Sequence, residues 1–158
     1  MIRRATRDDV PAIAELVYEL AEYEKARHEC TLTVEQLDVA LFGPSPALFA
    51  HVVEVDETIV GTAVWFLNFS TWDGVHGIYL EDLYVTPQQR GAGHGKALLA
   101  ALARECTEQG YSRLSWAVLD WNAPSIAFYE ALGARPQDEW TTYRLNGEAL
   151  TRLGSMPT

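Results

Sequence analysis

The sequence predicts a single α/β domain built around a mixed β-sheet. Helical and strand-like periodicities alternate along the chain, and no repeat, low-complexity tract or linker interrupts them. The length of 158 residues is that of one domain. A composition of 48% hydrophobic and 22% charged residues is ordinary for a globular protein.

The first strand and the first helix are expected near the N-terminus. Residues 2–5 have the pattern of a short strand. Thr6 followed by Asp9 is a capping-box signature, in which each side chain can accept a hydrogen bond from the other residue's backbone N–H. The helix predicted over residues 8–25 places apolar side chains on one face, at Val10, Ile13, Val17 and Leu20.

A second helix and three strands are expected next. Thr33 with Gln36 predicts the start of a shorter helix that runs to about residue 42, and Gly43 ends it. Strand-like runs follow at residues 49–55, 58–69 and 75–85. The pair Asp56-Glu57 predicts a tight turn between the first two of these strands.

The second half of the chain continues the alternation. Apolar residues at helical spacing predict a helix over residues 94–109, and Gly110 ends it. The expected order is then a strand at 111–119, a helix at 122–132 closed by Gly133, and a last strand at 140–145.

Composition excludes several classes of partner. The chain has 22 acidic and 12 basic residues, a net charge of −10, so we expect no nucleic acid partner and an attraction for cations, although many acidic surfaces serve only solubility. No apolar run approaches the ~18 residues of a membrane span, and no secretory leader is recognisable, so we expect no membrane partner and a cytoplasmic location. Two distant cysteines and four scattered histidines predict neither a disulfide nor a metal site.

A glycine-rich loop is the most informative motif. Three glycines lie between Arg90 and Lys96, where a helix start would direct unpaired N–H groups at an anion such as a pyrophosphate. A Walker-type loop would need glycine in place of Arg90 and Ser or Thr in place of Ala97, and the dinucleotide fingerprint would need glycine in place of Lys96. The remaining pattern is R-x-x-G-x-G, at Arg90, Gly93 and Gly95. A simple connecting turn is the alternative.

Acidic and aromatic residues flank this loop in sequence. Glu81 and Asp82 lie near the end of the strand expected at 75–85, before the loop. They face opposite sides of the sheet unless a bulge intervenes. Either carboxylate can equally be a solvated acid at a strand end. Asn122 is expected to cap the helix that follows, and Tyr129 lies two turns along on about the same face. Phe128 is interpreted as a core aromatic.

Four segments, in order, resemble the spermidine/spermine acetyltransferase-like branch of the GNAT superfamily of N-acetyltransferases. They are residues 20–24, 79–85, 90–95 and 121–129, within a match that runs from about residue 2 to 145. The resemblance implies the GNAT fold in one domain over residues 1–158, with a mostly antiparallel sheet flanked by about four helices. It also implies a homodimer and acetyl-CoA as the co-substrate.

The resemblance further implies roles for individual residues. The contacts to acetyl-CoA fall on Leu83, Tyr84, Val85, Arg90, Gly91, Ala92, Gly93, His94, Gly95, Lys96, Asn122 and Ser125. Tyr129 and Glu81 are the implied catalytic residues. The implied amine-binding residues are Tyr23, Glu24, Glu81 and Asp82. The family also uses an acid near the last strand, for which Asp138 and Glu139 are both candidates.

These residue types suit acetyl transfer to an amine. An alkylammonium with a pKa of about 10.4 must lose a proton before it attacks, and Glu81 can accept that proton directly or through water. Tyr129 can protonate the departing thiolate, and the backbone N–H of Leu83 can stabilise the carbonyl oxygen. A small cationic amine, either a polyamine, a diamine or a lysine/thialysine-like compound, is the expected substrate. The alternatives are a protein-lysine or N-terminal acetyltransferase and a non-catalytic acyl-CoA-binding regulatory module.

Overall fold

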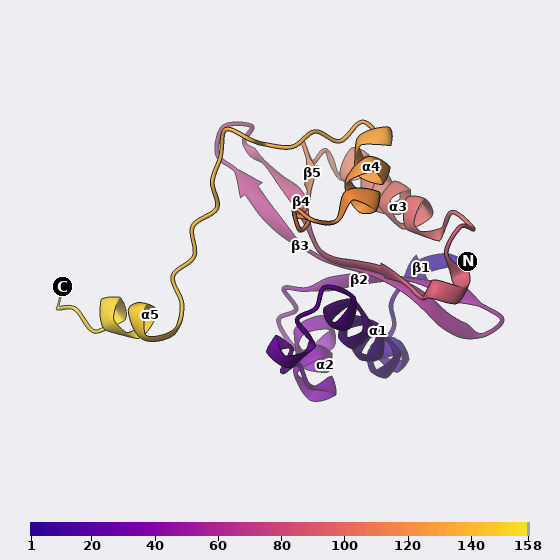
Figure 1. Cartoon of the computed structure of the whole chain (residues 1–158), viewed down its shortest axis with the longest axis horizontal. Helices are drawn as coiled ribbons and strands as arrows, with labels where there is room; N and C mark the ends of the chain where they lie inside the picture. Colours follow the sequence, from indigo (N-terminus) through magenta and orange to yellow (C-terminus); the bar gives the residue numbers. More distant parts are fainter. Residues whose placement is uncertain (158) are drawn as a thin grey trace. The chain divides into compact units, whose positions relative to one another are not determined.

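The computed structural model describes residues 1–157, which form two compact units with a boundary between Leu119 and Asp120 (Figure 1). The first unit holds a five-stranded sheet in the order β1-β2-β3-β4-β5. Its strands are β1 (Ile2–Arg4), β2 (Phe49–Val55), β3 (Thr58–Ser70), β4 (Val75–Val85) and β5 (Leu114–Ser115). Successive strands from β1 to β4 are antiparallel, and β5 pairs parallel to β4. The expected mixed, mostly antiparallel sheet is confirmed.

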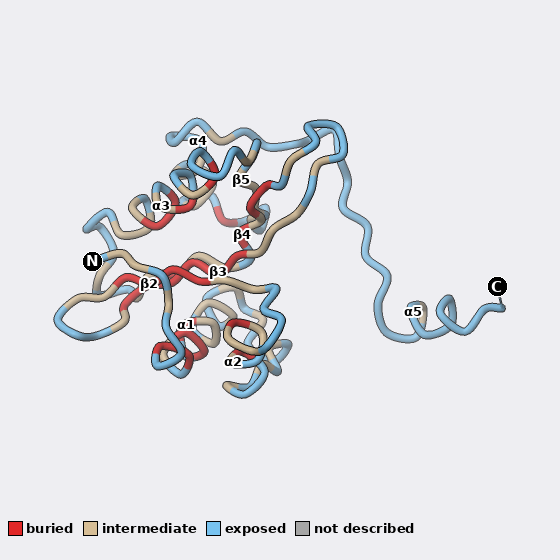
Figure 2. Tube along the Cα trace, turned by 180° about the vertical axis from the view of Figure 1, so that it is seen from behind, coloured by how far each residue is buried: buried red, intermediate tan, exposed pale blue. Residues whose placement is uncertain are grey.

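Helices cover both faces of this sheet (Figure 1). Helices α1 (Val10–Tyr23) and α2 (Val34–Phe42) lie on one face, and α3 (His94–Gln109) lies on the other. The core under the first two helices consists of Val10, Ile13, Ala14, Leu37, Leu41, Ala50, Val52 and Val64. Buried residues are concentrated in β2, β3, β4 and the inner faces of the three helices (Figure 2). The sheet is therefore the middle layer of three.

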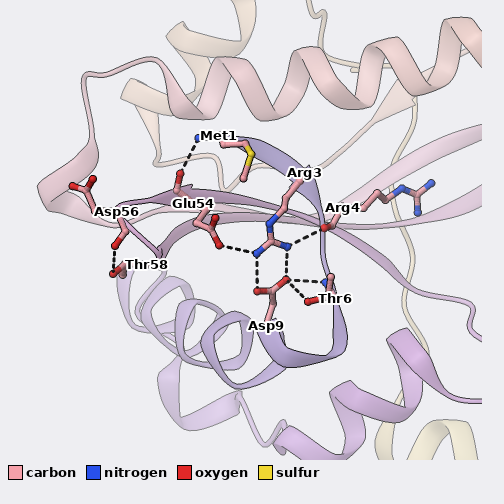
Figure 3. A network of polar contacts seen from close by, with 8 residues as sticks. All are labelled: Met1, Arg3, Arg4, Thr6, Asp9, Glu54, Asp56 and Thr58. Atoms are coloured by element: carbon pink, nitrogen blue, oxygen red, sulfur yellow. Dashed lines mark hydrogen bonds and ion pairs between the residues drawn. The ribbon is translucent and has the colours of Figure 1, made fainter.

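A polar network ties β1 to the start of α1 (Figure 3). Arg3 forms ion pairs with Asp9 at 2.7 Å and with Glu54 on β2 at 2.9 Å. The Asp9 carboxylate also accepts the backbone N–H of Thr6 at 2.7 Å, which confirms the expected capping box. The hydrogen bond from Arg3 holds the pKa of Asp9 below its usual value. These contacts fix the first helix against the edge of the sheet.

Most predicted boundaries agree with the structure. Thr33 and Gln36 form the second capping box, and Gly110 ends α3 with φ 75°. Asp56 and Glu57 have φ angles of 48° and 62°, the left-handed conformation that a two-residue hairpin turn of the primed type requires. Three short 3-10 turns, Arg7–Asp9, Arg27–Glu29 and Pro87–Gln89, connect the main elements.

Two strand predictions differ from the structure. Of residues 111–119, only the two of β5 form a strand, because they alone pair with β4, at Ile78 and Tyr79. The expected strand at 140–145 is wrong for this structure: those residues are irregular, and Trp140 and Tyr143 are 71% and 92% exposed. A segment rich in aromatic and β-branched residues becomes a strand only beside a partner edge, and the described part of the second unit contains no strand.

The second unit, from Asp120 onward, contains two helices. They are α4 (Ala123–Ala131) and α5 (Gly147–Gly154). Helix α4 agrees with the predicted helix at 122–132, whereas α5 was not expected and brings the total to five α-helices in the described residues. No helix among residues 1–157 is long and apolar enough to cross a membrane.

Candidate active site

A β-bulge places the two neighbouring carboxylates. On β3, Trp65 pairs with Leu80 and Val64 pairs with Asp82, so Glu81 is the extra residue on β4. Because Val64 and Trp65 are consecutive and face opposite sides, Leu80 and Asp82 also face opposite sides although they are two residues apart. The alternation expected from sequence is thus interrupted at Glu81, the position assigned to the base.

Asp82 lies near two other carboxylates at this bulge, those of Glu81 and Glu24. Asp82 lies on the sheet face that α1 covers, since its partner Val64 belongs to the core beneath α1 and α2. Burial, together with the smaller effect of the nearby charges of Glu81 and Glu24, raises the pKa of Asp82 to about 6. Burial also raises the pKa of Glu24, which caps the C-terminus of α1. The negative end of the α1 dipole adds to this field, so the cluster favours a cation.

The fourth predicted amine-binding residue, Tyr23, contacts an arginine. Tyr23 is the last residue of α1, and the Arg90 guanidinium lies 5.5 Å from the centre of its ring. The same guanidinium lies 5.3 Å from the ring of Tyr84, and Arg90 Nε donates to the carbonyl oxygen of Val85 at 3.0 Å. The Arg90 side chain therefore joins the end of β4 to the end of α1.

Sequence reasoning missed the contact between the Tyr84 ring and Arg90, because Tyr84 was expected to contact acetyl-CoA through its backbone. The side chain is buried, and burial raises its pKa, with Glu19 acting in the same direction. The signal available in the sequence was the series of acids at helical spacing along α1, Glu15, Glu19 and Glu22, which lines a face that an arginine can complement.

One edge of β4 is open beyond its pairing with β5. Within the described residues, β5 pairs only with Ile78 and Tyr79, so residues 80–85 have a strand partner, β3, on one side alone. The backbone bond from Thr86 N to Val60 O shows that Val85 and Gly61 form a non-hydrogen-bonded pair. By alternation, Val85 and Leu83 direct their N–H and C=O groups toward the open edge. An extended ligand with amide groups can pair with them like an added strand.

The glycine loop leaves α3 with an accessible N-terminus. Gly91 and Gly93 have φ angles of 86° and 83°, and a Cβ atom at either position would meet nothing within 4 Å. The N-cap of α3 is Gly93, and a glycine has no side chain that could occupy the N–H groups of the first turn. The N–H groups of the first turn, His94, Gly95 and Lys96, can therefore donate to an anion, and the helix dipole favours negative charge there. This geometry fits the pyrophosphate expected of the donor.

The remaining predicted site residues belong to the second unit. Asn122 is buried and caps α4, because its Oδ1 accepts the backbone N–H of Ser125 at 3.4 Å. Pro124 stands in the first turn, as expected. Tyr129 is half-buried two turns later, and its ring centre lies 5.5 Å from that of Phe128. The predicted helix cap and its spacing to the phenol are therefore both present.

Comparison with known proteins agrees with this geometry. The fold matches that of an integron cassette protein from Vibrio cholerae with a TM-score of 0.83 and 22% identity, over 99% of this chain and 98% of that one. Thialysine N-epsilon-acetyltransferase of Bos taurus is 37% identical over 97% of this chain and 96% of its own length. The human spermidine/spermine N(1)-acetyltransferase-like protein 1 is 31% identical over 94% of this chain and 23% of its own. The model of the acetyltransferase (GNAT) family matches residues 13–134, and the chain belongs to this family.

Proposed function

We propose that this enzyme transfers the acetyl group of acetyl-CoA directly to a primary amine of a small cationic substrate. The observation that carries the proposal is the cluster of Glu24, Glu81 and Asp82 at the end of α1 and the bulge of β4. A cation relieves the repulsion among these carboxylates. The thialysine N-epsilon-acetyltransferase to which the chain is similar acts, by its name, on a small amine of this kind.

The open edge of β4 and the glycine-rich loop form the proposed binding site for acetyl-CoA. Bound acetyl-CoA supplies the acetyl thioester. The outward C=O of Leu83 and the outward N–H of Val85 hold its amide-bearing arm, and the first turn of α3 holds its pyrophosphate, together with Lys96. The open space around Gly91 and Gly93 supports this assignment, since a side chain at either position would narrow the approach.

The acceptor side uses the carboxylates in different roles. Asp82 and Glu24 hold the ammonium group beside the thioester by charge. Glu81, the exposed residue at the bulge, accepts the proton that the amine must lose, through a water molecule. The N–H of Leu83 stabilises the negative charge that forms on the carbonyl oxygen. Tyr129 gives its proton to the departing thiolate.

An assay of released thiol tests the proposal against its alternatives. Acetyl-CoA is combined with spermidine, putrescine, thialysine, a lysine-containing peptide and a peptide with a free N-terminus. Release of free CoA with the small amines supports the proposal. Release with the peptides alone would replace it by a protein acetyltransferase, and tight binding of acetyl-CoA without release under any condition would replace it by a regulatory acyl-CoA-binding module.

We also propose that residues 1–158 act as one acetyltransferase domain, and that it forms a cytoplasmic homodimer. The family match at 13–134 runs across the boundary between the two compact units, which supports one domain. The homodimer is what the resemblance to the spermidine/spermine acetyltransferase-like branch implies. Sedimentation velocity measures the oligomeric state, and a monomer at micromolar concentration would contradict the homodimer.

A further inference from the structure

Arg90 lies between three parts of the proposed site. These are the glycine-rich loop that would bind acetyl-CoA, the open edge of β4, and the end of α1 that would bind the amine. In the chain Arg90 immediately precedes Gly91 of the loop. Its Nε donates to the Val85 carbonyl at 3.0 Å, the last outward-facing carbonyl of β4. Its guanidinium lies 5.5 Å from the Tyr23 ring and 5.3 Å from the Tyr84 ring. One side chain thus contacts both the strand that serves the donor and the helix end that serves the acceptor.

The groups around this guanidinium explain its place. Tyr84 is buried on the α1 side of the sheet. Burial raises its pKa, and the charges of Glu19 and Glu22 on α1 act in the same direction. The Arg90 guanidinium lies over two electron-rich ring faces, which attract a cation, and α1 carboxylates act on one of these two tyrosines. Tyr23 directly precedes Glu24, so an arginine that holds the Tyr23 ring also limits the movement of the Glu24 backbone.

We propose that Arg90 is a positioning residue that couples occupation of the donor loop to the arrangement of the amine site. When the donor orders residues 91–96, Arg90 is fixed at the start of that loop. The guanidinium then holds Tyr23, and through it Glu24, beside the bulge. The proposal rests on the function proposed above, and it assigns the Arg90 side chain to the acceptor side instead of to the pyrophosphate.

The geometry calls for arginine specifically. A planar guanidinium can lie against two rings while its Nε makes a directed hydrogen bond. Lysine keeps the charge but lacks both the plane and the Nε donor, so Arg90→Lys preserves attraction for a phosphate and removes the contacts to Tyr23 and Val85. This substitution therefore separates a role in phosphate binding from a role in positioning.

The first test compares Arg90→Lys with Lys96→Met, a matched change of a basic residue at the other end of the loop. We expect Arg90→Lys to raise the KM for the amine about fivefold with the dissociation constant for acetyl-CoA changed less than about twofold. We expect Lys96→Met to raise the dissociation constant for acetyl-CoA and to change the KM for the amine less than about twofold. Tyr23→Leu should resemble Arg90→Lys, and the double variant should be no worse than the worse single variant. Weakened acetyl-CoA binding with an unchanged amine KM in Arg90→Lys would overturn the proposal, as would additive effects of the two changes.

The second test needs no turnover. Hydrogen exchange of the backbone amides in residues 19–25 is measured with and without acetyl-CoA, at matched saturation of each variant. We expect the donor to slow this exchange in the wild-type protein and in Lys96→Met, but not in Arg90→Lys. Equal slowing in all three proteins would contradict the coupling. If no amine in the panel is acetylated, the proposed function fails while this measurement still decides the role of Arg90.

Discussion

Asp82 pairs with Val64 across β3 and β4, so its carboxyl group lies on the sheet face that α1 and α2 cover. Only the bulge at Glu81 allows this, because without it Asp82 would share the face of Leu80. The bulge therefore presents one exposed acid and one half-buried acid at adjacent positions. A half-buried acid suits charge recognition, and an exposed acid with access to water suits proton removal.

The first prediction concerns stability and Asp82→Asn. The folded-state pKa of about 6 exceeds the unfolded value of 3.8, so the folded state binds more protons between these values. The stabilisation from the protonated acid is complete below the unfolded pKa and is lost as pH rises through about 6. Asp82→Asn should therefore be more stable than the wild type at pH 8 by about 1 kcal/mol, after allowance for partial exposure, and not at pH 4. Urea unfolding at both pH values measures this, with Glu108→Gln, at an exposed position of α3, as the control. An equal difference between variant and wild type at the two pH values would contradict it.

The second prediction concerns the pH dependence of amine binding. Because Asp82 ionises near pH 6, the KM for a cationic amine should fall about three- to tenfold as pH rises from 5 to 7. Asp82→Asn should flatten this dependence. Initial rates over an amine series at each pH, with saturating acetyl-CoA, give the profile. A wild-type profile that is already flat between pH 5 and 7 would rule out Asp82 as an amine-binding group.

The third prediction concerns Tyr129→Phe. Loss of the phenolic hydroxyl should lower kcat about 100-fold or more and leave the affinity for acetyl-CoA unchanged. Tyr143→Phe is the matched control, because Tyr143 is 92% exposed and has no assigned role. Steady-state rates and calorimetric titration with CoA make the comparison. An unaffected kcat in Tyr129→Phe would remove the tyrosine from the mechanism.

The fourth prediction concerns Gly93→Ala, for which Gly110→Ala is the matched control. Both glycines have positive φ, 83° and 75°, and a Cβ atom meets nothing within 4 Å at either, so each substitution should cost about 1 kcal/mol of stability through backbone strain alone. Only Gly93→Ala should also weaken acetyl-CoA binding, because Gly93 caps α3 at the loop. Similar acetyl-CoA affinities in the two variants would place the anion elsewhere.

The sequence predicted the elements whose signals are local. The capping boxes at Thr6 and Thr33, and the Asn122 cap, involve residues three apart, and the structure has all three. The bulge at Glu81 was left open, because register depends on how β3 and β4 align over their whole length. The contact between Arg90 and Tyr23 joins residues far apart in the chain, which no local pattern reports.

The strand expected at 140–145 failed for a related reason. Its aromatic and β-branched residues favour an extended conformation but specify no partner, and a strand needs a neighbouring edge for its backbone hydrogen bonds. For the same reason, only two residues of the strand expected at 111–119 form a strand in the structure, namely those that pair with β4. The residue types at the loop and the bulge, and the mixed character of the sheet, could be predicted from the sequence, whereas the bulge and the lengths of the last strands could not.

Release of free CoA from acetyl-CoA across the amine panel tests the central claim most directly. We predict release with at least one small cationic amine, an acetylated amine as the product by mass spectrometry, and a large loss of the rate in Glu81→Gln. Purified protein that binds acetyl-CoA but releases no CoA with spermidine, putrescine or thialysine would contradict the claim.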